Sequence, residues 1–283
     1  MNPSYVSVHG GHSGQFCIHA RDRLEDIVKT YISHGFYWVG LTEHMPPVTN
    51  DLRYPDEKQA KLSSEVLFHQ FLKYIKEARR LQKKYADQIT LYVGMETETC
   101  TGSQPFLEKL IQQCQPDYIV GSVHHVNDMC IDFSKDHYTR AAEASGGIDA
   151  LYLRYFDTQY KMIQGIEPSV IGHFDLIRLH DPDYKKRMKK NRIWEKILRN
   201  LELIKEKDLI LDFNLRALYK GADEPYISEN ILKQAQALGI KVAPGDDSHG
   251  MDNIGLNIDR GIHILRSHGF DLPWPVPKRY NRS

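Results

Sequence analysis

The chain has 283 residues, of which 41% are hydrophobic and 26% are charged, a composition typical of a folded globular protein. Lysine plus arginine and aspartate plus glutamate both number 37, so the net charge is zero and gives no general electrostatic reason to expect a nucleic-acid or membrane partner. The four cysteines form no CxxC pair, the amino terminus lacks a basic segment followed by an apolar core, and no apolar run is long enough to span a bilayer. We therefore expect thiols, no signal peptide and a cytoplasmic location.

Short apolar runs alternate with helical patterns along the whole chain. The strand-forming residues Tyr5, Val6 and Val8 come first, and later strands are predicted at residues 37–41, 89–95, 118–123, 169–172, 209–213 and 240–243. Helices are predicted at residues 21–33, 64–85, 105–113, 151–163, 193–206, 231–238 and 257–267. Residues 48–63 and 127–150 are interpreted as loops, the second of which could cover a site. This alternation predicts one α/β domain with a parallel sheet, covering residues 1–283.

Potential metal ligands follow strand after strand. They are His12 and His19, then His44, Glu96, His124, His173, Asp247 and His249. Each histidine by itself is most simply a loop or core residue, but the carboxyl ends of parallel strands share one edge of the sheet, so the whole set would gather there. Imidazoles with carboxylates suit zinc, iron or manganese, and the set is larger than one tetrahedral ion needs. We therefore expect two or three divalent ions, with Glu96 as the bridging carboxylate.

Six short segments, each containing one or two of these potential ligands, together carry a family resemblance. They are residues 12–20, 41–46, 94–96, 121–124, 172–176 and 247–249. In this order they resemble the PHP (polymerase and histidinol phosphatase) superfamily, and within it the stand-alone enzymes of histidine biosynthesis. The resemblance implies a distorted (β/α)7 TIM-like barrel with a trinuclear metal site at the carboxyl ends of its strands. It also implies three ligand sets, namely His12, Glu96 and Asp247; Glu96, His124 and His173; and His19, His44 and His249.

The chain departs from the family pattern in its first motif. The family usually opens with His-x-His, whose two rings share one face of a strand. Here Gly10 stands two residues before His12, and the extra histidine is His9. On a regular strand His9 and His12 would face opposite sides. A bulge at Gly10 and Gly11 would return His9 to the site as a ligand, and without it the first metal has one protein ligand fewer.

The resemblance further implies hydrolysis of L-histidinol phosphate to L-histidinol and phosphate by a metal-activated water. Glu96, Asp247 and His249 are the expected catalytic residues, and Asp175 is expected to orient a metal-bound histidine. Substrate contacts are expected from four residues, namely Arg178, Arg216, His125 and Asn214. Two alternatives remain open: a PHP-type phosphoesterase acting on another small phosphate ester or a nucleic-acid end, and a metal-binding domain without catalysis. The sequence leaves the oligomeric state open.

Overall fold

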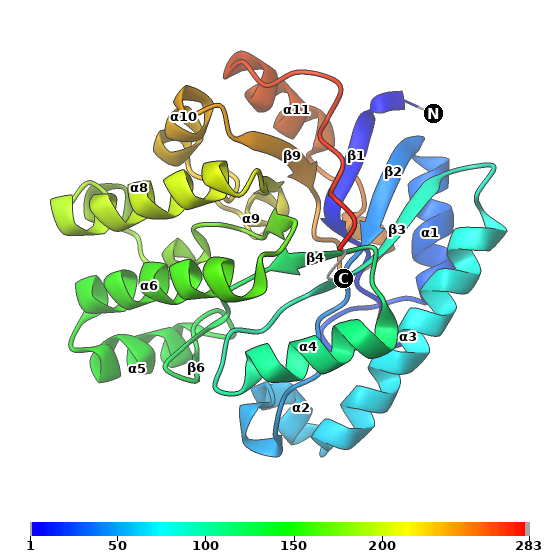
Figure 1. The fold of residues 1–283 in the computed structure, drawn as a ribbon, viewed down its shortest axis with the longest axis horizontal. Coiled ribbons are helices and arrows are strands. Elements are labelled where there is room, and N and C mark those ends of the chain that lie inside the picture. Colours follow the sequence, from blue (N-terminus) through cyan, green and yellow to red (C-terminus); the bar gives the residue numbers. More distant parts are fainter. Residues whose placement is uncertain (1, 281–283) are drawn as a thin grey trace.

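Each predicted apolar run forms one strand of a single parallel sheet in the computed structural model, which describes residues 2–280 (Figure 1). In sheet order the strands are β1 (Asn2–Gly10), β2 (Phe36–Leu41), β3 (Thr90–Glu96), β4 (Tyr118–Gly121), β7 (Val170–Ile171), β8 (Ile210–Asn214) and β9 (Lys241–Gly245). A small antiparallel hairpin, β5 (His125–Val126) with β6 (Met129–Cys130), lies outside this sheet. The seven strands form a nearly closed barrel, and the predicted fold class is confirmed.

Helices surround the barrel in the described part of the chain (Figure 1). They are α1 (Leu24–Ser33), α2 (Pro55–Gln59), α3 (Ser64–Lys84), α4 (Ser103–Cys114), α5 (Lys135–Ser145), α6 (Ile148–Ile166), α7 (Tyr184–Arg187), α8 (Asn191–Glu206), α9 (Arg216–Tyr219), α10 (Glu229–Ala237) and α11 (Ile258–Ser267). The longest, α3, begins where the Ser63 side chain accepts a hydrogen bond from the Val66 N–H, and it buries Leu67, Phe71 and Tyr74 at three- to four-residue spacing. Among residues 2–280, no helix is long and apolar enough to cross a membrane.

Side chains complete the barrel where β1 meets β9. The Ser7 hydroxyl lies 2.6 Å from the Asp246 carboxylate and accepts a hydrogen bond from the Asp246 N–H at 3.1 Å. One residue further along, the Asp247 N–H donates to the His9 carbonyl at 2.8 Å. These contacts hold the ends of the first and last strands side by side. Ligands near the two ends of the sequence therefore reach one site.

The carboxyl-terminal tail crosses the opposite end of the barrel. The Tyr280 N–H donates to the carbonyl of Asp117, the residue before β4, at 2.9 Å. The Ser169 hydroxyl, just before β7, donates to the Lys278 carbonyl at 2.7 Å. Because the tail covers the amino-terminal ends of these strands, the accessible end of the barrel is the one that carries the predicted ligands.

Two segments expected to be loops contain helices, so that part of the prediction was wrong. Residues 48–63 include the short 3-10 helix η1 (Asn50–Leu52) and α2, which begins with Pro55 in its first turn and is too short to display helical periodicity. Residues 127–150 include α5, whose buried face consists of Tyr138, Ala141, Ala142 and Ser145 and therefore lacks the large aliphatic residues that reveal an amphipathic helix. The first helix was predicted to begin at Arg21 but begins at Leu24. The Arg21 N–H donates a hydrogen bond to the His249 carbonyl, which holds this residue outside the helix.

The first strand carries a bulge, which lies between Ser7 and Gly10 and so begins before the Gly10-Gly11 pair where it was predicted. Ser7 pairs with Val39 and Gly10 with Leu41, so three steps along β1 match only two along β2. Gly11 follows with φ of +73°, a conformation that glycine adopts without strain. The bulge and the turn bring the rings of His9 and His12 to the same site, with their centroids 5.8 Å apart.

Candidate metal centre

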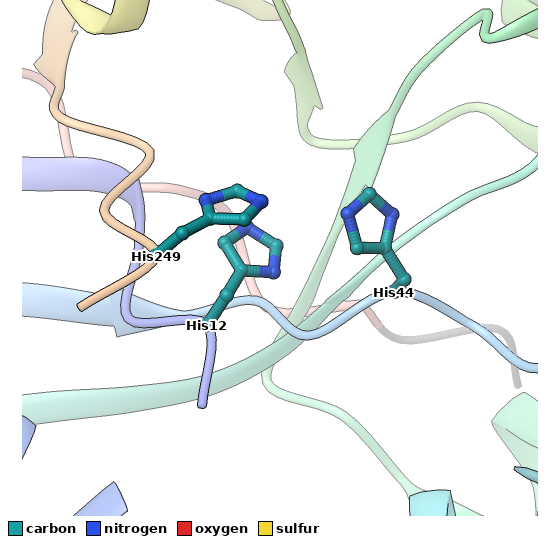
Figure 2. Close-up of side chains that lie close together, drawn as sticks. All are labelled: His12, His44 and His249. Atoms are coloured by element: carbon teal, nitrogen blue, oxygen red, sulfur yellow. The ribbon is translucent and has the colours of Figure 1, made fainter. Parts of the chain in front are cut away.

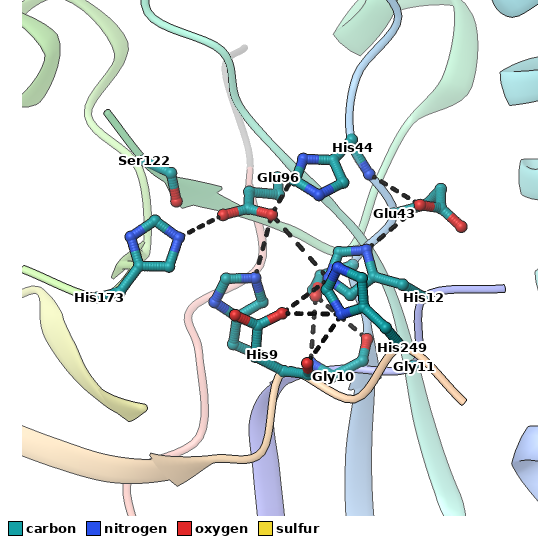
Figure 3. Close-up of polar contacts among 12 residues, drawn as sticks. His9, Gly10, Gly11, His12, Glu43, His44, Glu96, Ser122, His173 and His249 are labelled. Atoms are coloured by element: carbon teal, nitrogen blue, oxygen red, sulfur yellow. Dashed lines mark hydrogen bonds and ion pairs between the residues drawn. The ribbon is translucent and has the colours of Figure 1, made fainter. Parts of the chain in front are cut away.

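Eight of the nine predicted ligands form one cluster at the carboxyl ends of the strands (Figures 2 and 3). Their ligand atoms make four overlapping groups, each within 4.8 Å: His12, His44 and His249; His9, His173 and Asp247; His9, His12 and Glu96; and His44, Glu96 and His124. In Figure 2 the rings of His12 and His249 lie close together, with centroids 4.3 Å apart, and the ring of His44 lies to one side of them. Because the groups share members, the cluster is able to bind several metal ions.

Glu96 occupies the middle of the cluster, between His173 on one side and His9 and His44 on the other (Figure 3). Its Oε1 lies 2.8 Å from His173 Nε2 and 3.2 Å from His124 Nε2. Its Oε2 lies 3.2 Å from both His9 Nε2 and His44 Nδ1. Each carboxylate oxygen of Glu96 thus faces two imidazoles.

A carboxylate stands behind three of these histidines, and the sequence analysis missed all three carboxylates. A carboxylate oxygen of Asp212 lies 2.9 Å from His9 Nδ1, one of Glu43 lies 3.2 Å from His12 Nδ1, and one of Glu98 lies 3.1 Å from His124 Nδ1. A carboxylate can only accept, so each Nδ1 donates and the Nε2 lone pair is directed at the cluster. The sequence offered a signal for Glu98, because residues two apart in an extended chain point to the same side and Glu98 follows Glu96 at that spacing. It offered none for Asp212, which lies within an apolar strand and does not follow it.

Burial and neighbouring charges set the protonation of the cluster. Burial alone would raise the pKa of Glu96, but His9 and the other nearby imidazoles hold that pKa well below its ordinary value. The same balance, again with His9 as the leading partner, keeps the pKa of Asp247 well below its usual range. Burial and the proximity of His12 hold the pKa of His249 well below its ordinary value. The cluster therefore offers ionised carboxylates and, at His249, a neutral imidazole. Burial alone would lower the pKa of His9 and His12, but the nearby carboxylates raise both, so metal binding at these two rings would release protons.

His19 is the one predicted ligand outside the four groups. Its Nδ1 lies 2.8 Å from Asp56 on α2, and its ring centroid lies 5.8 Å from that of His44. It nevertheless lines the same pocket as His44 and His249. The missed helix α2 thus supplies the side chain that holds His19 beside the cluster.

The cluster opens into a pocket of about 180 Å³. Its other lining residues include Arg216 and Lys220 from α9 and its end, together with Asp132, Phe133 and Tyr226. Of these only Arg216 was predicted, because the others depend on how segments distant in sequence come together. Asn214, also predicted, lies beneath the pocket, where its amide donates to Asp212 at 2.9 Å and to Asp247 at 3.1 Å.

Two predicted substrate residues lie behind the pocket lining. The Arg178 guanidinium donates to the Glu224 and Pro225 carbonyls at 2.8 and 2.6 Å and packs over the Tyr226 ring. His125 lies 3.2 Å from Glu98 and packs against Tyr54. Asp175, expected behind a metal-bound histidine, instead accepts from the Ser228 N–H and lies 3.2 Å from Arg178. These contacts correct the expected role of Asp175 and place Arg178 and His125 one layer away from the pocket.

Comparison with known proteins identifies the family. A family model described as the PHP domain matches residues 10–216. The chain therefore belongs to the PHP domain family, as the resemblance implied.

Curated relatives bear a more specific name. The probable histidinol-phosphatase of Schizosaccharomyces pombe is 39% identical and aligns with 93% of this chain and 85% of its own. The histidinol-phosphatase of Saccharomyces cerevisiae is 27% identical, over 89% of this chain and 85% of its own.

Solved structures agree with the fold. A candidate histidinol phosphatase from Listeria monocytogenes superposes with a TM-score of 0.79 at 25% identity, covering 90% of this chain and 99% of its own. The histidinol phosphate phosphatase of Lactococcus lactis, crystallised with zinc, L-histidinol and phosphate, gives a TM-score of 0.69 at 19% identity, over 95% of both chains. The second likeness is evidence for the fold alone.

Proposed function

We propose that this protein is a metal-dependent phosphomonoesterase that hydrolyses L-histidinol phosphate to L-histidinol and phosphate. The observation that carries the proposal is the buried cluster of imidazoles around Glu96, which opens into a pocket lined by both cationic and anionic side chains. The names of the curated relatives support the same substrate. We further propose that residues 1–283 act as a single PHP-type phosphoesterase domain, since its one barrel uses strands from β1 to β9.

The donor atoms in the cluster fit metal ions. His9 Nε2, His12 Nε2 and His44 Nδ1 are buried and make no well-aligned hydrogen bond among residues 2–280, although carboxylate oxygens of Glu96 or Asp247 lie 3.2–3.3 Å from each of them. Buried polar atoms normally make hydrogen bonds, so three such ring nitrogens that only approach carboxylates favour coordination. We propose that all nine predicted ligands hold two or three ions of zinc, iron or manganese, with His19 joining His44 and His249. Such ions, when bound, acidify water and neutralise charge on the oxygens of a phosphate ester.

Two cations of the pocket are suited to the phosphate group. Arg216 and Lys220 stand one helical turn apart, both line the pocket, and neither has a carboxylate ion-pair partner among the described residues 2–280. Arg216 is fixed, because its Nη1 donates to the Asp247 carbonyl at 2.9 Å and its N–H to Asn214 Oδ1 at 3.0 Å. A fixed guanidinium fork binds phosphate oxygens in a defined orientation. Asn214 therefore acts by holding Arg216 and Asp247 in place.

The remaining lining residues are suited to the rest of the substrate. L-Histidinol carries an ammonium group and an imidazole ring. Asp132 offers a carboxylate to the ammonium, and Phe133, 41% exposed, offers a ring for the imidazole to pack on. The pocket thus offers cationic groups for phosphate together with anionic and aromatic groups for the amino alcohol.

The three predicted catalytic residues have distinct tasks in this proposal. Glu96 and Asp247 remain ionised at neutral pH because their pKa values are held low, so they supply fixed negative charge to the cluster. His249 donates from Nδ1 to the Asp247 carbonyl at 2.9 Å, which leaves the Nε2 lone pair available. These groups hold the reacting centre at the base of the pocket.

The test is phosphate release from L-histidinol phosphate, measured with and without added manganese or zinc and beside a panel of other phosphomonoesters. We expect a strong preference for L-histidinol phosphate, lost on chelation and in Glu96→Ala. The matched control is Glu77→Ala, which removes a glutamate that pairs with Arg80 on the outer surface of α3 and should leave activity unchanged. Turnover of other esters alone would contradict the proposed substrate, and no turnover with metals bound would favour a non-catalytic domain.

We place this activity in the cytoplasm. All four cysteines, Cys17, Cys100, Cys114 and Cys130, are free thiols in the structure, which suits a reducing compartment. Fractionation of source cells would contradict this location if the protein were found only outside the cytoplasm.

A further inference from the structure

Tyr226 is a lining residue of the pocket that neither the sequence motifs nor the metal cluster explains. It is only 2% exposed, and its hydroxyl has no hydrogen-bond partner among residues 2–280. Its ring lies edge-on to His173, with centroids 6.3 Å apart. Leaving a buried hydroxyl unpaired costs about 1–3 kcal/mol, so a polar group retained at such a position points to a ligand that pairs with it.

The Tyr226 side chain is able to donate a hydrogen bond to a ligand in the pocket. A phenol with its ordinary pKa of about 10 is neutral at physiological pH, so its O–H remains available as a donor. Tyr226 lines the same pocket as Asp132 and Asp247.

The backbone of Tyr226 is fixed by its neighbours on both sides. Tyr226 exchanges two backbone hydrogen bonds with Asn214 at the end of β8, at 2.5 and 3.1 Å. Arg178 binds the carbonyls of the two preceding residues and lies 4.7 Å from the ring centroid, and Asp175 accepts from the Ser228 N–H at 2.9 Å. Asp175 and Arg178 are themselves 3.2 Å apart. This buried pair therefore clamps the segment before and after Tyr226.

We propose that the Tyr226 hydroxyl donates a hydrogen bond to a phosphoryl oxygen of the bound ester, and that the Asp175–Arg178 pair positions Tyr226 for this contact. The inference rests on the proposed phosphatase function and deepens it by assigning a third phosphate-binding side chain. Arg178 acts through Tyr226, which explains why a buried arginine lies close to the pocket without lining it. A neutral donor adds directional binding beside Arg216 and Lys220 without a further positive charge next to the metal ions.

Inorganic phosphate is the probe, because its binding to the metal-loaded protein does not depend on the identity of the alcohol. We expect Tyr226→Phe to raise the Kd for phosphate about ten-fold or more, the effect of losing one hydrogen bond to a charged oxygen. The value of kcat/KM for any ester that the protein turns over should fall in parallel. Metal content should not change, and the unfolding midpoint of the phosphate-free protein should stay the same or rise, since the ring is retained and the unpaired hydroxyl is removed. A phosphate Kd within two-fold of the native value would overturn the proposal.

Tyr138→Phe is the matched control. Tyr138 is also 2% exposed with an unpaired hydroxyl, but it packs against His180 and is separate from the residues that line the pocket. The same chemical change there should leave the phosphate Kd unchanged. Equal weakening in both variants would mean that loss of a buried hydroxyl merely loosens the fold, and would overturn the assignment.

Arg178→Lys tests the positioning role independently and keeps the charge that balances Asp175. It should weaken phosphate binding in the native background and add nothing in the Tyr226→Phe background, because both substitutions remove the same contact. Additive effects would show that Arg178 contacts phosphate directly, and would overturn the proposal that Arg178 acts by positioning Tyr226. If L-histidinol phosphate is not a substrate, the function proposed above fails while the phosphate Kd values still decide the role of Tyr226.

Discussion

Asp212 offers the sharpest test of how the metal centre is built. This residue of β8 is fully buried, and its Oδ2 receives three contacts: His9 Nδ1 at 2.9 Å, the His173 N–H at 3.3 Å and the Asn214 amide at 2.9 Å. One carboxylate oxygen thus orients two candidate ligands and the residue that holds Asp247. We predict that Asp212→Ala weakens metal binding although Asp212 is not itself a ligand.

The expected magnitude follows from these contacts. Loss of a carboxylate partner behind a metal-binding histidine typically lowers metal affinity about 10- to 100-fold, or about 1.4–2.7 kcal/mol. The substitution also leaves the buried His173 N–H without its acceptor, which costs about 1–3 kcal/mol in the metal-free protein. Asp212→Asn retains an oxygen that can accept these bonds, so it should lose less on both counts.

Metal affinity is measured by titrating the metal-free variants with zinc or manganese in a calorimeter, and stability by urea unfolding without metal. Asp208→Ala is the control, because Asp208 is exposed and, among residues 2–280, forms ion pairs only with Lys241 and Lys278. Its affinity should equal that of the native protein. Native metal affinity in Asp212→Ala would refute the reasoning, since His9 would then need no partner to bind.

Three further predictions concern stability. Burial alone would raise the pKa of Asp117, but hydrogen bonds from the Val93 N–H and Arg79 lower that pKa below its ordinary value. The ionised carboxylate therefore adds to the free energy of unfolding. This contribution is complete above about pH 4 and is lost as the pH falls through the lowered pKa. Urea unfolding should show Asp117→Asn less stable by about 1–3 kcal/mol at pH 7, with the difference shrinking below pH 4; a constant difference would contradict this. Gly10→Ala should lose about 1–3 kcal/mol in thermal unfolding, because its Cβ would lie 2.6 Å from the Tyr31 hydroxyl, and an unchanged midpoint would count against such crowding. Chelation should lower the unfolding midpoint reversibly, because ions held by the folded state at 100 times their Kd add about 2.7 kcal/mol, and a midpoint that stays fixed when the metals leave would exclude this linkage.

The crowding at Gly10 also explains the departure from the family motif. A side chain at this position would meet Tyr31, Asp246 and Ser7, whose hydrogen bonds join the first and last strands. A histidine therefore does not fit at position 10, and His9 lies in the site instead, 3.2 Å from Glu96. The sequence indicated that a bulge could achieve this, but only the pairing of Ser7 and Gly10 with β2 established it.

The strands and most of the cluster were predictable because both depend on local pattern. Apolar runs form buried parallel strands, and a histidine or glutamate that follows each run lies at the carboxyl edge whatever the rest of the chain does. Elements without a strong pattern were missed, as α2 and α5 illustrate. The role of Arg178 was equally out of reach, because an arginine after a strand end is compatible both with contacting phosphate and with holding a neighbouring loop.

The sequence by itself determined the fold class, the family and seven residues of the cluster, since these follow from apolar periodicity and from the order of ligands along the chain, whereas it left His9 open. The tertiary structure decided which partner each ligand has. Asp212 behind His9, Asp56 behind His19 and Tyr226 in the pocket all result from segments distant in the chain meeting at one end of the barrel. Such contacts depend on distances of about 3 Å between side chains on different elements, and no local pattern encodes them.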